Sequence, residues 1–68
     1  MNRDMLEGKW NQIKGEARKQ YGQLTDDDLA RIQGNWDTFV GKLQERYGYT
    51  REQAENEAES FLEAFETA

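Results

Sequence analysis

The 68-residue chain contains no cysteine and no histidine. The lack of cysteine excludes disulfides, thiolate nucleophiles and Cys-type zinc sites, and the lack of histidine removes the usual base and metal ligand. Catalysis would have to depend on carboxylates, Lys or Tyr, and a chain this short has little room for a sheltered cleft. We therefore expect one small domain over residues 1–68, with no enzymatic activity, no cofactor and no metal.

Long hydrophobic runs are also missing. No stretch approaches 18 apolar residues, and the start Met1-Asn2-Arg3-Asp4 leads into mixed polar sequence without an apolar signal region. We expect neither membrane association nor export, and the predicted compartment is the cytoplasm. Charged residues make up 34% and hydrophobic residues 35% of the chain, so the protein is hydrophilic, and its two Trp, three Tyr and three Phe favour a globular core over disorder.

The charge is acidic overall and unevenly distributed. Fourteen acidic and nine basic residues give a net charge of −5, which opposes non-specific attraction to nucleic acid. Residues 1–22 hold five basic and three acidic side chains, whereas residues 51–68 hold one basic and six acidic side chains. We interpret the two ends as solvated helical faces that attract each other weakly. The alternative is that the acidic C-terminal helix forms a surface for a protein partner.

An internal repeat organises the chain. Five glycine and aromatic positions recur at an offset of 26 residues: Gly8 and Gly34, Trp10 and Trp36, Gly15 and Gly41, Tyr21 and Tyr47, and Gly22 and Gly48. Each copy continues with a threonine, Thr25 or Thr50, and an acidic or amide residue three positions later. The repeating unit is a helix, a glycine stop and a newly capped helix, so two units predict two helical hairpins.

Apolar spacing predicts four helices, over residues 4–21, 26–33, 35–47 and 51–66, and no strand. Thr25 with Asp28 and Thr50 with Gln53 are typical capping boxes, and Gly22 suits a left-handed position after the first helix. Predicted core residues lie on one face of each helix: Leu6, Trp10, Ile13, Ala17 and Tyr21; Leu29 and Ile32; Trp36, Phe39, Val40, Leu43 and Tyr47; Ala54, Ala58, Phe61, Leu62 and Phe65.

These motifs resemble the CsbD-like family of small bacterial stress proteins. The resemblance rests on the first glycine, Trp and Tyr-Gly unit with Leu24-Thr25-Asp26-Asp27-Asp28, and on Val40-Gly41-Lys42-Leu43-Gln44-Glu45-Arg46-Tyr47-Gly48 after Gly34, and it covers roughly residues 2–60. It implies a cytoplasmic bacterial protein of the general stress response. It also implies a SAM-like all-α fold, in which two α-hairpins pack roughly at right angles as a duplicated helix-hairpin-helix. The family supplies no catalytic or ligand residues to assign.

Two acidic clusters are candidate sites. Asp26, Asp27 and Asp28 suit a divalent cation chemically, but an EF-hand spacing is missing and a helix start favours negative charge, so we interpret them as capping residues. The row Glu52, Glu55 and Glu59 suggests a general acid and base pair, but such pairs need a cleft and separated pKa values. We interpret this row as a solvated helix face.

The aromatic and basic residues suggest a second class of function. Trp10, Trp36, Tyr21 and Tyr47 have the side chains of a base-stacking platform, although their helical spacing favours a core. Arg3, Lys14 and Arg18 on the first helix and Lys42 with Arg46 on the third would contact phosphates in a nucleic-acid or anion-binding module of the helix-hairpin-helix kind. The acidic last helix and the three aspartates oppose this alternative.

The glycines form a stripe opposite the apolar face. Gly8, Gly15 and Gly22 coincide on a helical wheel, and Gly41 lies away from the core face of its helix. Each interior glycine costs about 1 kcal/mol relative to alanine. Either these helices are kinked or locally loose, or a second surface needs close backbone approach, and we favour the first. The sequence thus predicts a non-enzymatic stress-response protein that acts by protection or by interaction.

Overall fold

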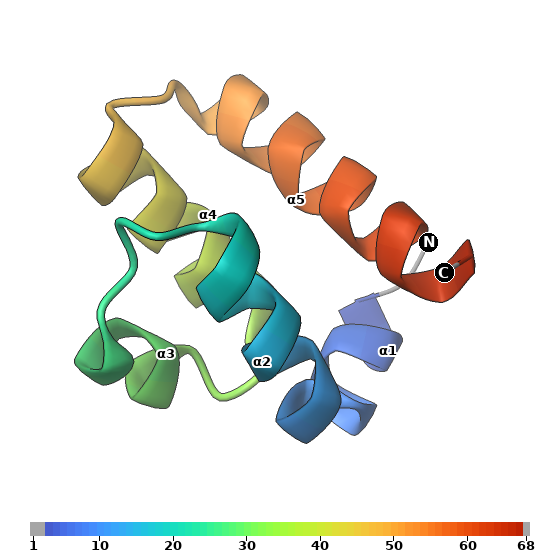
Figure 1. Cartoon of the computed structure of the whole chain (residues 1–68). Helices are drawn as coiled ribbons and strands as arrows, with labels where there is room; N and C mark the ends of the chain where they lie inside the picture. Colours follow the sequence, from blue (N-terminus) through green and yellow to red (C-terminus); the bar gives the residue numbers. More distant parts are fainter. Residues whose placement is uncertain (1–2, 68) are drawn as a thin grey trace.

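The computed structural model describes residues 3–67 and consists of helices joined by short connections (Figure 1). Five helices are present: α1 (Arg3–Gly8), α2 (Trp10–Gln20), α3 (Asp26–Ile32), α4 (Trp36–Tyr47) and α5 (Arg51–Thr67). No strand occurs within the described range. The all-α fold class is therefore confirmed, whereas the expected number of four helices is wrong.

The fifth helix arises because the predicted helix 4–21 is interrupted at Lys9. This residue has φ −118° and ψ 25°, and it serves as the N-cap of α2 without a capping side-chain hydrogen bond. Its N–H still donates to the Met5 carbonyl (2.9 Å), while its own carbonyl accepts from Gln12 and Ile13 (3.0 and 2.9 Å). The apolar spacing passes through the break unchanged, which is why periodicity predicts one continuous helix.

Close backbone packing accompanies the break. α1 packs against α4, and just before α4 a Cβ placed on Gly34 would lie 2.7 Å from the Glu7 Cα and 3.0 Å from the Leu6 carbonyl oxygen. Gly34 has φ +82°, so both its missing side chain and its left-handed backbone are required. α1 is a separate helix from α2, and its backbone at Leu6 and Glu7 lies directly against Gly34.

The predicted capping boxes are both present. Thr25 Oγ1 accepts from the Asp28 N–H and the Asp28 carboxylate accepts from the Thr25 N–H, both at 3.0 Å. Thr50 and Gln53 make the same reciprocal pair at 2.9 and 3.1 Å. Gly48 ends α4 in the left-handed region, with φ +72°. The prediction for Gly22 is wrong, because α2 ends through Tyr21 at φ −118° and Gly22 has no positive φ.

The core lies around α4, which packs against α1, α3 and, most extensively, α5. α5 follows α4 after a short connection and runs back beside it (Figure 1). Most predicted core residues are buried, and Leu24 joins them unpredicted. Four predicted core aromatics are instead only half-buried: Trp10, Tyr47, Phe61 and Phe65. Trp10 and Tyr47 are the terminal residues of α2 and α4, and Phe61 and Phe65 lie in the C-terminal half of α5.

Candidate functional site

The most strongly structured polar site is centred on Asp28, which is 1% exposed. Arg46 on α4 donates from Nε to Oδ2 (2.8 Å) and from Nη2 to Oδ1 (2.9 Å) of this carboxylate. Lys42, one helical turn earlier, places Nζ 3.5 Å from Oδ1. The capping residue of α3 therefore also joins α3 to α4. The sequence motif predicts the cap but does not indicate its two cationic partners.

This environment fixes the charge of Asp28. The hydrogen bonds from Arg46 hold the pKa of the Asp28 carboxyl well below its usual range, the Thr25 N–H and the Lys42 charge lower it further, and burial opposes them. The carboxylate is ionised at neutral pH, and its oxygens are occupied by donors. A base of such low pKa accepts protons poorly, so the cluster is suited to holding helices together.

The other two aspartates point to different partners. Asp26 pairs with Arg18 at 2.8 Å and Asp27 pairs with Arg31 at 2.9 Å, and all four side chains are exposed. The capping interpretation is confirmed for Asp28 by its hydrogen bonds with Thr25. Across residues 3–67, no group of three or more acidic side chains is arranged to hold a metal ion.

Three of the cations expected to contact phosphates are paired with aspartates at the start of α3. Lys42 and Arg46 contact Asp28, and Arg18 pairs with Asp26. Because α1 and α2 are separate helices, Arg3 does not continue the flank that carries Lys14 and Arg18. Instead, the Arg3 guanidinium lies over the Trp36 ring, 4.9 Å from its centroid.

The predicted aromatic platform is largely core. Tyr21 and Trp36 are 4% and 6% exposed, and Tyr21 makes edge contacts with Phe39, Tyr47 and Phe61 at centroid distances of 6.0, 6.0 and 5.4 Å. Burial and then the nearby Glu57 carboxylate raise the pKa of the Tyr21 hydroxyl. The Tyr21 hydroxyl lies 3.3 Å from the Glu57 carbonyl and carboxylate oxygens, so its role is to tie α2 to α5.

The glutamate row on α5 is a surface feature. Glu52 and Glu59 are exposed and Glu55 is half-buried. Glu55 accepts from Arg51 Nε (3.1 Å), whose Nη2 also donates to Asp37 (2.9 Å). The interpretation as a solvated face is thus confirmed for Glu52 and Glu59. The Arg51–Asp37 ion pair links α5 to the start of α4.

The glycine stripe faces open space. A Cβ placed on Gly8, Gly15, Gly22 or Gly41 meets no other atom within 4 Å. Close helix approach within this chain therefore does not explain these four glycines. The close approach occurs at Gly34 instead, which the sequence indicates only as a helix stop.

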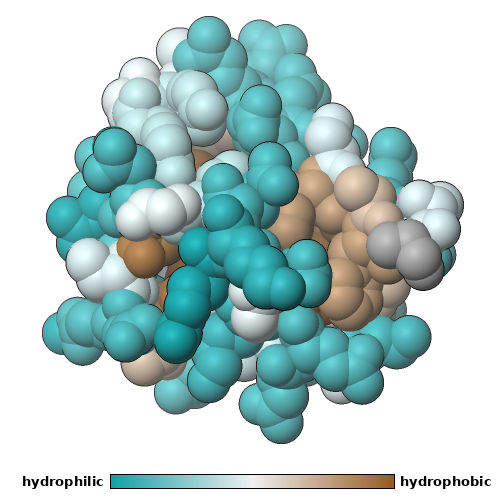
Figure 2. All heavy atoms as spheres, in the orientation of Figure 1, coloured by the Kyte–Doolittle hydropathy of each residue, from teal (hydrophilic) through white to brown (hydrophobic). Residues whose placement is uncertain are grey.

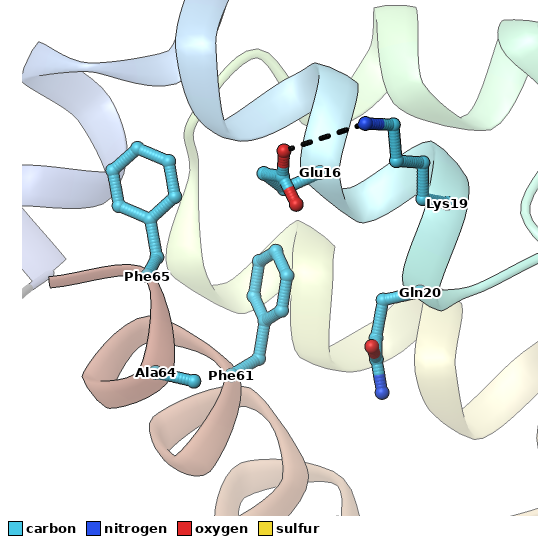
Figure 3. Close-up of a pocket in the computed structure, with 6 residues that line it drawn as sticks. All are labelled: Glu16, Lys19, Gln20, Phe61, Ala64 and Phe65. Atoms are coloured by element: carbon cyan, nitrogen blue, oxygen red, sulfur yellow. Dashed lines mark ion pairs between the residues drawn. The ribbon is translucent and has the colours of Figure 1, made fainter. Parts of the chain in front are cut away.

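An open groove of about 400 Å³ between α2 and α5 is the surface feature that sequence reasoning missed (Figure 3). We call it the α2–α5 groove, and its lining residues come from both helices: Glu16, Lys19, Gln20, Phe61, Ala64 and Phe65. The available signal was the pair of large aromatic residues, Phe61 and Phe65, one turn apart near the end of α5. A smaller polar hollow lies at the junction of α1 and α2.

The helices are short or polar by the standard of a lipid bilayer. Among the described residues, no helix combines the length and the apolar character needed to cross a membrane.

Comparison with known proteins places the chain in one family. The CsbD-like family model matches residues 4–56. The UPF0337 protein YjbJ of Escherichia coli O6:H1 is 52% identical over 61 residues, covering 90% of this chain and 88% of the relative. A UPF0337 protein of Pectobacterium atrosepticum is 56% identical over 57 residues (84% and 83%), and one of Bordetella pertussis is 48% identical over 63 residues (93% and 96%). The chain belongs to the CsbD-like family.

Proposed function

We propose that this CsbD-like chain is a non-enzymatic protein of the bacterial general stress response, which acts in the cytoplasm by protection or by binding a protein. Residues 1–68 would form one functional domain. The two-hairpin, SAM-like arrangement is part of the same proposal, and the packing of α5 against α4 supports it. The family match over residues 4–56 supports the assignment to a stress-response family.

The non-enzymatic assignment rests on where the charged side chains lie and which partners they have. The one buried carboxylate among the described residues, Asp28, is held by two cations, and the acidic row on α5 is spread along a surface helix. The α2–α5 groove is lined by two phenyl rings, a methyl group, an amide and a Glu16–Lys19 ion pair of 3.8 Å. An acid and base pair working together would need two titratable groups of separated pKa in one sheltered site.

The alternative of a nucleic-acid or anion-binding module is not favoured by these contacts. Phosphate binding needs cations that are free to face a common ligand, whereas Arg18, Lys42 and Arg46 are paired with aspartates. A titration with DNA and RNA at low and near-physiological salt tests this alternative, because a true binder shows a steep salt dependence.

The proposed role is tested in cells of the source bacterium. A deletion strain should survive heat, high salt or drying less well than a strain complemented with the wild-type gene. Complementation with the Asp28→Asn variant, whose fold is weakened as described below, should restore survival only in part. Crosslinking in the stressed, complemented cells should recover a protein partner if the role is binding, and no reproducible partner if it is general protection. Equal survival of deletion and complemented strains under every stress would overturn the proposal.

A further inference from the structure

The α2–α5 groove leaves parts of two phenyl rings in contact with solvent. Phe61 and Phe65 are half-buried, and both rings project from α5 toward α2 (Figure 3). Figure 2 shows apolar side chains gathered on this face, over the C-terminal half of α5. Leaving parts of two phenyl rings in water forgoes hydrophobic free energy that a covering surface would recover.

The acidic side chains of α5 are concentrated on the side of the helix that lies away from this groove. At 100° per residue, one side of the helix carries a continuous acidic row: Glu52, Glu55, Glu59, Glu63 and Glu66. The side next to the groove carries Gln53, Glu57, Ser60 and Ala64, with one carboxylate among them. The acidic side therefore faces away from the phenyl rings.

The opposite edge of the groove is electrically neutral. It is formed by α2, where Glu16 and Lys19 lie one turn apart and make an ion pair of 3.8 Å, with both side chains more than half exposed. The edge thus presents one negative and one positive charge beside an apolar floor, on a chain whose net charge is −5.

We propose that the α2–α5 groove is a self-association surface and that its occupant is the same groove of a second copy of this chain. A symmetric dimer brings one patch against itself, so the patch must be self-complementary. This groove meets that requirement, because Lys19 of one copy can face Glu16 of the other while the phenyl rings cover each other. Contact through the acidic side of α5 would instead oppose two rows of carboxylates.

The size of the molecule limits the strength of this dimer. A stable interface buries about 800 Å² on each partner, which is close to one fifth of the 4325 Å² exposed by this chain. The molecule measures 27 × 23 × 18 Å, so a single face provides at most an interface of that size. We expect a weak monomer–dimer equilibrium, of the kind formed by small and transient interfaces.

Sedimentation velocity over a concentration series from about 10 µM to about 1 mM tests the dimer by mass action. The wild-type protein should shift from monomer to dimer. Ala64→Glu should raise the dissociation constant by about tenfold or more, because each copy then adds a negative charge inside the contact. Ala64 is exposed, so the fold should be retained, as helical circular dichroism will show. Ala30→Glu is the matched control, since Ala30 is exposed on α3, and it should dimerise like the wild type.

A charge exchange tests the pairing itself. Lys19→Glu makes the edge of the groove wholly acidic and should abolish the dimer, whereas the double variant Glu16→Lys, Lys19→Glu restores one charge of each sign and should recover it. Arg31→Glu is the control, because Arg31 also stands in the last turn of its helix and pairs with an exposed aspartate. A protein that stays monomeric over the whole series would overturn the proposal, as would a dimer that is unchanged by Ala64→Glu or weakened equally by Ala30→Glu.

Discussion

Replacing Asp28 with Asn isolates the contribution of the buried carboxylate to stability. The substitution keeps the size of the side chain but turns one acceptor oxygen into an NH₂ donor, which then faces donors from Arg46, Lys42 or Thr25. In the wild type those oxygens accept from Arg46 at 2.8 and 2.9 Å and from the Thr25 N–H at 3.0 Å. The change therefore weakens the helix cap and the link from α3 to α4 together.

The expected loss is about 3 kcal/mol. Breaking a buried ion pair costs about 3–5 kcal/mol and losing a cap about 1 kcal/mol, but the Arg46 side chain is 38% exposed and can regain water. A small single domain has about 3–5 kcal/mol in total, so the variant should keep at most about 2 kcal/mol and be partly unfolded at 37 °C. Urea denaturation followed by helical circular dichroism measures the difference. The control is Asp27→Asn, which breaks an exposed pair with Arg31 and should cost far less, because solvent screens such a pair.

The same variant has a predicted pH dependence. The pKa of Asp28 is lowered on folding from an ordinary value of 3.8, mainly by Arg46. A lowered pKa in the folded state means that this stabilisation is complete well above pH 3.8 and is lost as the pH falls from there toward the folded pKa. The difference between wild type and Asp28→Asn should shrink below that pH. A difference under about 0.5 kcal/mol at pH 7, or one equally large at neutral and acidic pH, would refute a buried charged cluster.

Other substitutions test the glycines, the core and the acidic turn. Gly15→Ala should stabilise by about 0.4–1 kcal/mol, because its new methyl group meets open space on an exposed helix face. Gly34→Ala should destabilise by about 2 kcal/mol or more through clash and a left-handed backbone, and thermal unfolding will show whether the two signs differ. Trp36→Ala should cost about 3–5 kcal/mol, and near-native helical circular dichroism on heating would mean that this ring is not core. Calorimetric titration with Mg²⁺ or Ca²⁺ should be flat, whereas micromolar binding that is abolished by the double change Asp26→Asn, Asp27→Asn would reverse the capping interpretation.

Local patterns accounted for much of the fold. The capping boxes at Thr25 and Thr50 each lie within four residues, and the hydrogen bonds found there are the ones the motifs predict. The glycine at the end of α4 has the expected left-handed backbone. Gly22 does not, since α2 ends through Tyr21. One glycine stop resembles another in sequence, and the packing around it determines its backbone geometry.

The main features of the candidate site depend on contacts between distant residues. Asp28 and Arg46 are 18 positions apart, and the sequence alone indicates the aspartate as a helix cap and the arginine as a candidate phosphate contact. The groove likewise needs α2 and α5 side by side before Phe61 and Glu16 can line one surface. The helical wheel placed the phenylalanines on the apolar side of α5 but contained no information about how far α2 covers them.

The sequence by itself determined the helical class, the caps, most of the core and the family resemblance, because each depends on residue type and on spacing along a single helix or repeat. The tertiary structure decided the break at Lys9, the close approach at Gly34, the cations around Asp28 and the open α2–α5 groove. These features follow from the relative placement of separate helices. That placement depends on how the faces of all the helices pack together, and it cannot be read from the periodicity of one helix.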